Sequence, residues 1–221
     1  IEGLHFLDKV VDIEVAGGLA RAVVLGSGAR VAGDVIVNVA GAWGPEVCAM
    51  VGMRVPVEPL SRNTFYFEIR GQVETMPLTK DPSGVAFRQE GAGFTAGQTD
   101  INVPFGFDWD VHHDKFEEVF WPALAHRVPA FEALQVKRGW SGHYAYNRMD
   151  GNTIIGKWIG GLDNFYIATG FTGAGLQKGP AIGRAITELL LHGGYQTIDL
   201  SRMSYQRVID DEPLLETGFS A

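Results

Sequence analysis

The chain has 221 residues, a formal net charge of −8 and a hydrophobic content of 46%. Its length suffices for one large domain or two small ones. The acidic charge and the lack of a basic block argue against a nucleic-acid surface, and no apolar run approaches the roughly 20 residues that a membrane span needs. The single cysteine, Cys48, excludes an internal disulfide, and a small buried thiol is the default for it.

The first forty residues predict a short antiparallel meander with glycine-containing turns. Strands are expected over 6–15, 20–25 and 30–39. Because strand character begins at Ile1 and no leader is visible, we expect the reading frame to begin further upstream.

Residues 34–40 are nearly all apolar, which favours a strand buried on both faces. Gly41 then turns the chain into a helix that carries Trp43, Val47 and Met50. A buried strand, a small-residue turn and a helix are half of a nucleotide-binding α/β unit.

A β-rich region from residue 57 to about 109 predicts a second, antiparallel layer. A helix over 114–124 follows, with Phe116, Val119 and Phe120 on one face, and Pro122 is expected to limit its length. Strands are expected over 64–69, 84–90, 94–98, 136–146, 152–158 and 164–169.

A glycine-rich loop, residues 170–180, joins the last of these strands to a patterned helix. The buried face of that helix is predicted from three-and-four spacing, Gly193-Gly194 ends it, and Pro180 suits its first turn. The predicted face consists of Ile182, Ala185, Ile186, Leu189 and Leu190, with Arg184 and Glu188 elsewhere. Free amides at a helix start favour an anionic ligand, although a tight turn without a ligand fits the spacing equally well.

Two residue clusters match known catalytic or metal-binding motifs only weakly. The run Gly139 to His143 nearly matches the G-x-S-x-G nucleophile elbow, but strand lies on both sides of it. In His112-His113-Asp114, adjacent side chains point apart, so a solvated loop is favoured over a metal site.

Arg62, Arg88 and Tyr144 fall on predicted strands of the second layer. Guanidinium and phenol donors suit a small anionic substrate, whereas surface charge and core packing are the structural alternatives.

Two motifs resemble the D-amino acid oxidase-like family of FAD-dependent oxidoreductases. The first is the strand and turn 35–43, with Gly41, Ala42 and Trp43 on the FAD diphosphate side. The second resembles the family's flavin loop. It comprises Gly170, Phe171, Thr172, Gly173, Ala174, Gly175, Leu176 and Gln177. Ala174 stands where many relatives place a His, and Gln177 stands where some place a Lys.

The resemblance implies a mixed α/β (α+β) fold. It comprises a partial FAD-binding Rossmann-like unit, residues 1–55 and 161–200, an antiparallel-sheet substrate domain, 56–160, and a C-terminal tail, 201–221. The family's G-x-G-x-x-G motif precedes this chain, so a missing N-terminal FAD-binding half or partner chain is expected.

The implied function is oxidation of the C–N bond of a small amine or amino acid by hydride transfer to FAD, with Arg62, Arg88 and Tyr144 as catalytic candidates. A narrower resemblance is to FAD-dependent oxidoreductase-domain proteins that include a mitochondrial complex I assembly protein. It rests on residues 56–59, 83–91 and 193–201 and leaves open a non-catalytic assembly or interaction protein with the same fold.

Overall fold

The computed structural model describes residues 3, 6–71 and 73–215. The chain forms two compact units. The first unit comprises Ile1–Pro59 and Tyr144–Ala221, and the second comprises Leu60–His143. Residues 1, 2, 4 and 5 of the expected N-terminal strand region, and 216–221 of the expected tail, lie outside the described residues.

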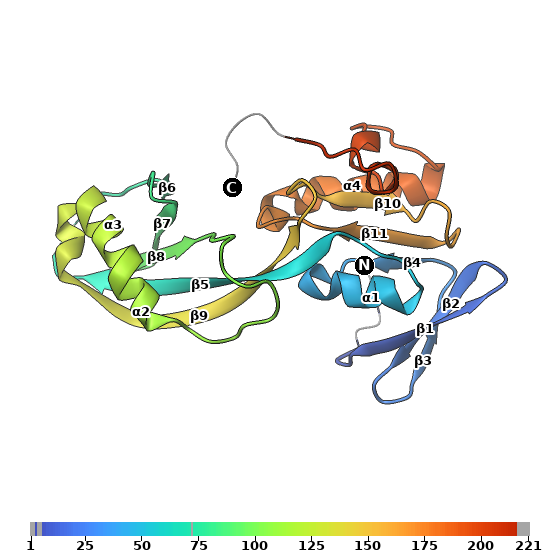
Figure 1. Ribbon diagram of the computed structural model, residues 1–221, viewed down its shortest axis with the longest axis horizontal. Coiled ribbons are helices and arrows are strands. Elements are labelled where there is room, and N and C mark those ends of the chain that lie inside the picture. The colour runs from blue at the N-terminus through green and yellow to red at the C-terminus, as the bar shows by residue number, and fades with distance from the viewer. Residues whose placement is uncertain (1–2, 4–5, 72, 216–221) are drawn as a thin grey trace. The chain divides into compact units, whose positions relative to one another are not determined.

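The predicted meander is present in the first unit (Figure 1) as a three-stranded antiparallel sheet of order β1-β2-β3. Its strands are β1 (Val10–Ala16), β2 (Leu19–Leu25) and β3 (Arg30–Ala32). β1 therefore begins four residues later than the sequence predicts. The turn after it uses Gly17 and Gly18 with φ of +61° and +73°, which glycine adopts without a Cβ clash.

A single strand over 30–39 is wrong, because the chain leaves the first sheet after Ala32 and enters another at β4 (Ile36–Asn38). Ile36 and Val37 pack against different apolar clusters, as a strand covered on both faces should. The flanking Val35 and Val39 are exposed, so the predicted burial does not extend to the ends of the segment. A 3-10 turn (Gly41–Trp43) and α1 (Gly44–Met50) follow, as predicted.

The second sheet of the first unit has the order β10-β11-β4. β11 (Phe165–Thr169) pairs parallel with β4 and antiparallel with β10 (Ile154–Lys157). Through this pairing β10 belongs to the first unit, which differs from the expected boundary at residue 160.

Helix α4 (Gly175–His192) packs along this sheet through Ile182, Ala185 and Ile186 (Figure 1). It begins five residues before Pro180, so the prediction that Pro180 lies in the first turn is wrong. The predicted face is also wrong at two positions. Leu190 is 37% exposed, whereas Glu188 is buried because it accepts hydrogen bonds from the chain that follows the helix. Gly193, at φ +70°, ends the helix as predicted.

Residues 201–215 are part of the fold of the first unit. A 3-10 turn (Ser201–Met203) and α5 (Gln206–Ile209) bury Tyr205 and Arg207. The Tyr205 hydroxyl donates to the carbonyl of Arg54, 2.7 Å away.

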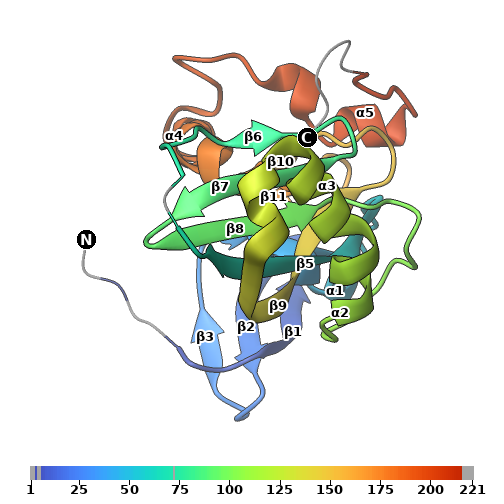
Figure 2. The same cartoon turned by 90° about the vertical axis from the view of Figure 1, so that its left-hand side faces the viewer.

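The second unit contains an antiparallel sheet of order β6-β7-β8-β5-β9 (Figure 2). Its strands are β5 (Val57–Ile69), β6 (Thr79–Lys80), β7 (Val85–Glu90), β8 (Gly93–Gln98) and β9 (Leu134–Asn147), of which β5 and β9 continue into the first unit. One face is covered by helices and holds the core. That core includes Phe65, Phe67, Phe87, Phe94, Phe116, Phe120 and Phe131.

The helix after β8 is longer than predicted. It runs through α2 (His113–Lys115), a π turn (Phe116–Phe120) and α3 (Trp121–Arg127), and a 3-10 segment (Pro129–Ala133) follows. Pro122 does not end the helix. It lies just after the π turn, and local departures from α geometry of this kind are where helices accommodate proline.

Candidate functional site

A tight loop joins the end of β11 to the start of α4 in the first unit. Gly170 and Gly173 have φ of +71° and +89°. A Cβ on Gly170 would lie 3.1 Å from Asn147 Cβ, and a Cβ on Gly173 would lie 2.9 Å from Cζ of the Tyr144 ring. Conformation and space therefore both require glycine at these two positions.

Thr172 holds a left-handed conformation, φ +49°, that is rare for a β-branched residue. Its amide donates to the carbonyl of Ala145 at 3.0 Å, and its hydroxyl accepts from the amide of Asn147 at 3.1 Å. The same hydroxyl donates to the carbonyl of Gly170 at 3.3 Å. Such a conformation costs about 1–3 kcal/mol and persists only where neighbouring groups enforce it. The end of β9 enforces it here.

Helix α4 presents its first amide groups directly after this loop. The first intrahelical bond runs from the Lys178 amide to the Ala174 carbonyl, so the amides of residues 175–177 have no partner inside the helix. They lie at the positive end of an 18-residue helix, which favours negative charge nearby.

The carboxyl ends of β4 and β11 meet at Gly44. A Cβ on Gly44 would lie 2.9 Å from Thr169 Oγ1, which is buried and has no hydrogen-bond partner among the described residues. The buried Asn38 fixes the adjoining turn, because its Nδ2 donates to the Gly44 carbonyl at 2.8 Å and its Oδ1 accepts from the Ala40 amide at 3.1 Å. The predicted turn residues Gly41, Ala42 and Trp43 are thereby held at the ends of two parallel strands.

A cavity of about 360 Å³ adjoins this turn. Lys9 and Glu46, whose charged groups are 3.6 Å apart, contribute the charged groups of its mostly apolar lining. The lining residues are Lys9, Val10, Ala40, Trp43, Glu46, Val47 and Met50. Sequence reasoning missed the contribution of Lys9 and Val10, which the fold of the first unit brings to α1.

Of the three catalytic candidates, Tyr144 lies in the first unit, against Gly173, whereas Arg62 and Arg88 lie in the second. Phe65, Phe87 and Phe94 are on the core face of the sheet, so the alternation of side chains places both arginines on the opposite face. The Arg62 guanidinium covers Gly97 and donates to Thr64 Oγ1 at 3.0 Å. Arg88 is exposed and pairs with Glu90 at 2.8 Å.

An aromatic cluster on this outer face was not predicted. The Tyr66 hydroxyl lies over Gly93, and the Arg138 guanidinium lies 5.8 Å and 5.0 Å from the ring centroids of Tyr66 and Trp140. Burial, followed by the nearby Glu68 carboxylate, raises the pKa of Tyr66. Gly93 and Gly97, two glycines on the same face of β8, were the available signal, because they leave space for large side chains on the neighbouring strand.

The two weakly matching residue clusters have structural roles in the second unit. Ser141 lies within β9 and donates to the Asp108 carbonyl at 2.8 Å, while His143 Nε2 accepts from the Asp108 amide at 2.9 Å. His112 and Asp108 form an exposed pair at 2.9 Å. Within residues 6–71 and 73–215, no group of three His, Cys, Asp or Glu side chains is arranged to hold a metal ion.

Parallel strands whose carboxyl ends meet a glycine loop and a helix N-terminus are typical of α/β proteins that bind nucleotide cofactors. The family profile described as FAD dependent oxidoreductase matches residues 3–189. The chain therefore belongs to this family, the FAD-dependent oxidoreductases related to D-amino acid oxidase.

Relatives in this family include amine and amino-acid dehydrogenases. FAD-dependent oxidoreductase domain-containing protein 1 of Xenopus laevis is 41% identical over 83% of this chain, which covers 40% of that protein. Mitochondrial sarcosine dehydrogenase of Homo sapiens is 26% identical over 72% of this chain and 18% of its own length. The crystal structure of L-proline dehydrogenase from P. horikoshii superposes with a TM-score of 0.83 at 23% identity, covering 93% of this chain and 55% of that one.

The chain thus spans less than half the length of the curated relatives it matches. In the described part of the chain, no helix has the length and apolar character required to cross a membrane.

Proposed function

We propose that this chain forms the C-terminal part of a flavoenzyme that oxidises the C–N bond of a small amine or amino acid. The observation that carries the proposal is the loop 170–175. Its glycines and Thr172 hold a strained backbone at the start of an 18-residue helix, beside the Tyr144 ring. The left-handed Thr172, anchored by hydrogen bonds, is the kind of enforced backbone strain that clusters at ligand-binding sites.

Three features of the first unit fit FAD. Thr169 Oγ1 is a buried polar atom without a partner among the described residues, at the strand ends where such cofactors bind. The first amides of α4 suit an electron-rich group, and the cavity beside Trp43 provides an apolar wall. We assign Gly170 to Gln177, together with Gly41, Ala42 and Trp43, to the cofactor side of the site.

When bound, FAD supplies the acceptor for a hydride equivalent from the substrate C–H bond. The chain supplies positioned donors, since the amides of residues 175–177 favour negative charge at the start of α4. The ring of Tyr144, which lies against Gly173, would contact the substrate side of the site.

Arg62 is the better candidate for the group that binds a substrate carboxylate. Its guanidinium lies directly over Gly97 and donates to Thr64 Oγ1, which fixes its position, whereas the Arg88 side chain is exposed. Guanidinium groups bind carboxylates through two parallel hydrogen bonds, which fixes both position and orientation. The substrate class that follows is amines that carry a carboxylate.

The test is an FAD titration of the 221-residue chain, followed by the quenching of flavin fluorescence and by flavin absorption after desalting. Gly173→Ala is the test variant, and Gly179→Ala is the matched control, because a Cβ on Gly179 has no neighbouring atom within 4 Å.

Binding that Gly173→Ala weakens and Gly179→Ala does not weaken supports the proposal. If a longer form with the front half of the cofactor domain also fails to bind FAD, the catalytic proposal is overturned. The alternative function, a non-catalytic assembly or interaction protein with the same fold, is then favoured.

A further inference from the structure

The first unit contains a buried ion pair between Arg207 and Asp150, residues 57 positions apart in the chain. The side chains are 6% and 0% exposed. Arg207 Nε donates to Asp150 Oδ2 at 3.0 Å, and Nη2 donates to Oδ1 at 3.2 Å. A buried pair of this kind fixes geometry more than it adds stability, because the bonds formed offset the cost of removing both charges from water.

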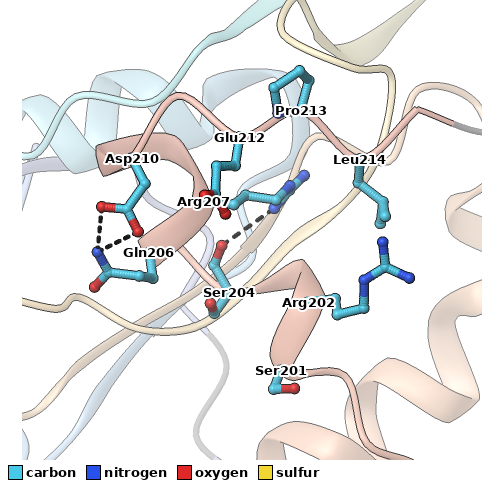
Figure 3. Close-up of a pocket in the computed structure, with 9 residues that line it drawn as sticks. All are labelled: Ser201, Arg202, Ser204, Gln206, Arg207, Asp210, Glu212, Pro213 and Leu214. Carbon is cyan, nitrogen blue, oxygen red and sulfur yellow. Dashed lines mark hydrogen bonds between the residues drawn. The ribbon is translucent and has the colours of Figure 1, made fainter.

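The remaining donors of Arg207 are also occupied. Nη1 donates to the carbonyl of Met203 at 3.0 Å, and Nη2 donates to the Asn152 carbonyl at 3.1 Å. Nη1 also donates to the Ser204 carbonyl at 3.3 Å, the bond drawn in Figure 3. Arg207 therefore offers no spare donor to the cavity of about 290 Å³ beside it. The role of Arg207 is internal, and it ties the C-terminal segment to the turn 147–152.

Asp150 is hydrogen-bonded to Asn147 as well as to Arg207. Asp150 Oδ1 accepts from Asn147 Nδ2 and from the Asn152 amide, both at 2.9 Å, and Oδ2 accepts from the Leu214 amide at 2.9 Å. Burial by itself would raise the pKa of Asp150, but the hydrogen bonds from Arg207 and from these amides lower it overall. The carboxylate is thus charged at neutral pH and accepts bonds at both oxygens.

Asn147 is the link to the cofactor loop. Its side chain bonds to Asp150, its amide donates to Thr172 Oγ1, and its Cβ would lie 3.1 Å from a Cβ on Gly170. Three bonded steps therefore connect α5 with the strained residue of the loop, and each step lies within one compact unit.

We infer that Arg207 is a positioning residue for the cofactor loop 170–175, acting through Asp150 and Asn147 to hold Thr172 in its left-handed conformation. The C-terminal segment thereby has a role in the site although it provides no ligand for the cofactor. The statement that the loop faces FAD rests on the proposed function. The statement that Arg207 holds the loop is independent of the proposed function.

Amide hydrogen exchange in the 221-residue chain tests the inference, because the Thr172 amide donates to the Ala145 carbonyl and the Asn147 amide donates to Thr172 Oγ1. The reference is the Trp158 amide, which donates to the Phe165 carbonyl in the same unit. We expect Arg207→Met to speed exchange at Thr172 and Asn147 about 10-fold more than at Trp158, as a local opening does. Arg207→Lys should restore part of the protection, because it keeps the charge beside Asp150.

Gln206→Ala is the matched control. Gln206 lies on the same helix as Arg207, but its side chain donates to Asp210 and not to Asp150. If Arg207→Met leaves Asp150 buried without a counterion and the chain does not fold, the double variant Asp150→Asn/Arg207→Met removes both charges together. Equal acceleration at Thr172, Asn147 and Trp158, or none at Thr172, overturns the inference.

An FAD titration of the same variants separates the two proposals. Faster exchange confined to Thr172 and Asn147 in Arg207→Met, together with weakened FAD binding, supports both the positioning role and the proposed function. Selective exchange in a chain whose longer form never binds FAD supports the positioning role of Arg207 and overturns the proposed function.

Discussion

The ring of Tyr144 lies directly against the Cα of Gly173, so that a Cβ at position 173 would come within 2.9 Å of Cζ and 3.0 Å of Cε2 of the ring. The two residues are 29 positions apart and come from the end of β9 and from the loop before α4. A candidate substrate-side residue and a candidate cofactor residue are therefore in contact within one compact unit.

We expect Gly173→Ala to disturb the loop much more than Gly175→Ala. At Gly173 the φ of +89° and the Tyr144 ring both oppose a Cβ, at a cost of about 1–3 kcal/mol. At Gly175 a Cβ would only reach ordinary contact with Phe171, 3.6 Å away, in a helical turn where alanine is favoured. Thermal unfolding and FAD titration of both variants measure the difference.

Thr172→Ala should lower the free energy of unfolding more than Gly175→Ala does. It keeps the backbone strain but loses the hydroxyl that accepts from Asn147 and donates to Gly170, which corresponds to about 0.5–1.5 kcal/mol per hydrogen bond. Equal losses for the variants at 172, 173 and 175 would contradict this account of the loop.

Substitution of Arg62 should affect carboxylate-bearing substrates selectively. In an enzyme that contains the front half of the cofactor domain, Arg62→Ala is expected to cost about 1.5–3 kcal/mol in kcat/KM for an amino acid, the value of hydrogen bonds to a charged group. Gly97→Ala should reproduce part of this loss, because its Cβ would displace the guanidinium.

Arg88→Ala is the control for Arg62, because its exposed pair with Glu90 contributes little. Steady-state kinetics with an amino acid and with the amine that lacks its carboxylate distinguish the roles. If Arg62→Ala lowers kcat/KM equally for both substrates, Arg62 does not bind the substrate carboxylate.

Glu188 should stabilise the first unit in a pH-dependent way. The Thr197 hydroxyl and then the Gln196 amide hold the pKa of Glu188 at about 2, below its ordinary value of 4.5. Because the pKa is lower in the folded state, this stabilisation is fully present above pH 4.5 and is lost as the pH falls toward 2.

Glu188→Gln should therefore destabilise the chain at pH 7, where the new amide group would face the donors of Gln196 and Thr197. The difference in free energy of unfolding from the unmodified chain should narrow as the pH falls from 4.5 toward 2. Denaturant titrations across this range measure it, and a constant difference would show that the charge is not responsible.

Cys48 should resist alkylation while the chain is folded. Burial raises the pKa of its thiol to about 11, although the hydrogen bond from Asn38 opposes this shift. The reactive thiolate is therefore scarce at pH 8, and the sulfur is inaccessible. Iodoacetamide labelling followed by mass spectrometry should show modification only in denaturant, and rapid labelling of the folded chain would contradict the described packing.

The sequence alone predicted those features that depend on local pattern. Apolar spacing located most strands and helix α4, and Gly193 marked the end of that helix. Local pattern erred where distant contacts decide. Glu188 has the sequence position of an exposed residue but is buried, because residues 196 and 197 fold back to bond its carboxylate.

Only the tertiary structure decided how the candidate site is held. The glycine pattern marked the loop 170–175, but the left-handed Thr172 depends on Asn147 and, through Asp150, on Arg207. Gly97 likewise gains its role from Arg62, which lies on a neighbouring strand. Sequence periodicity reports which face of an element is apolar, whereas the contacts of Thr172 with Asn147 and of Asp150 with Arg207 join residues 25 and 57 positions apart. Their geometry exists only once the strands have paired and the C-terminal segment has packed against the turn 147–152.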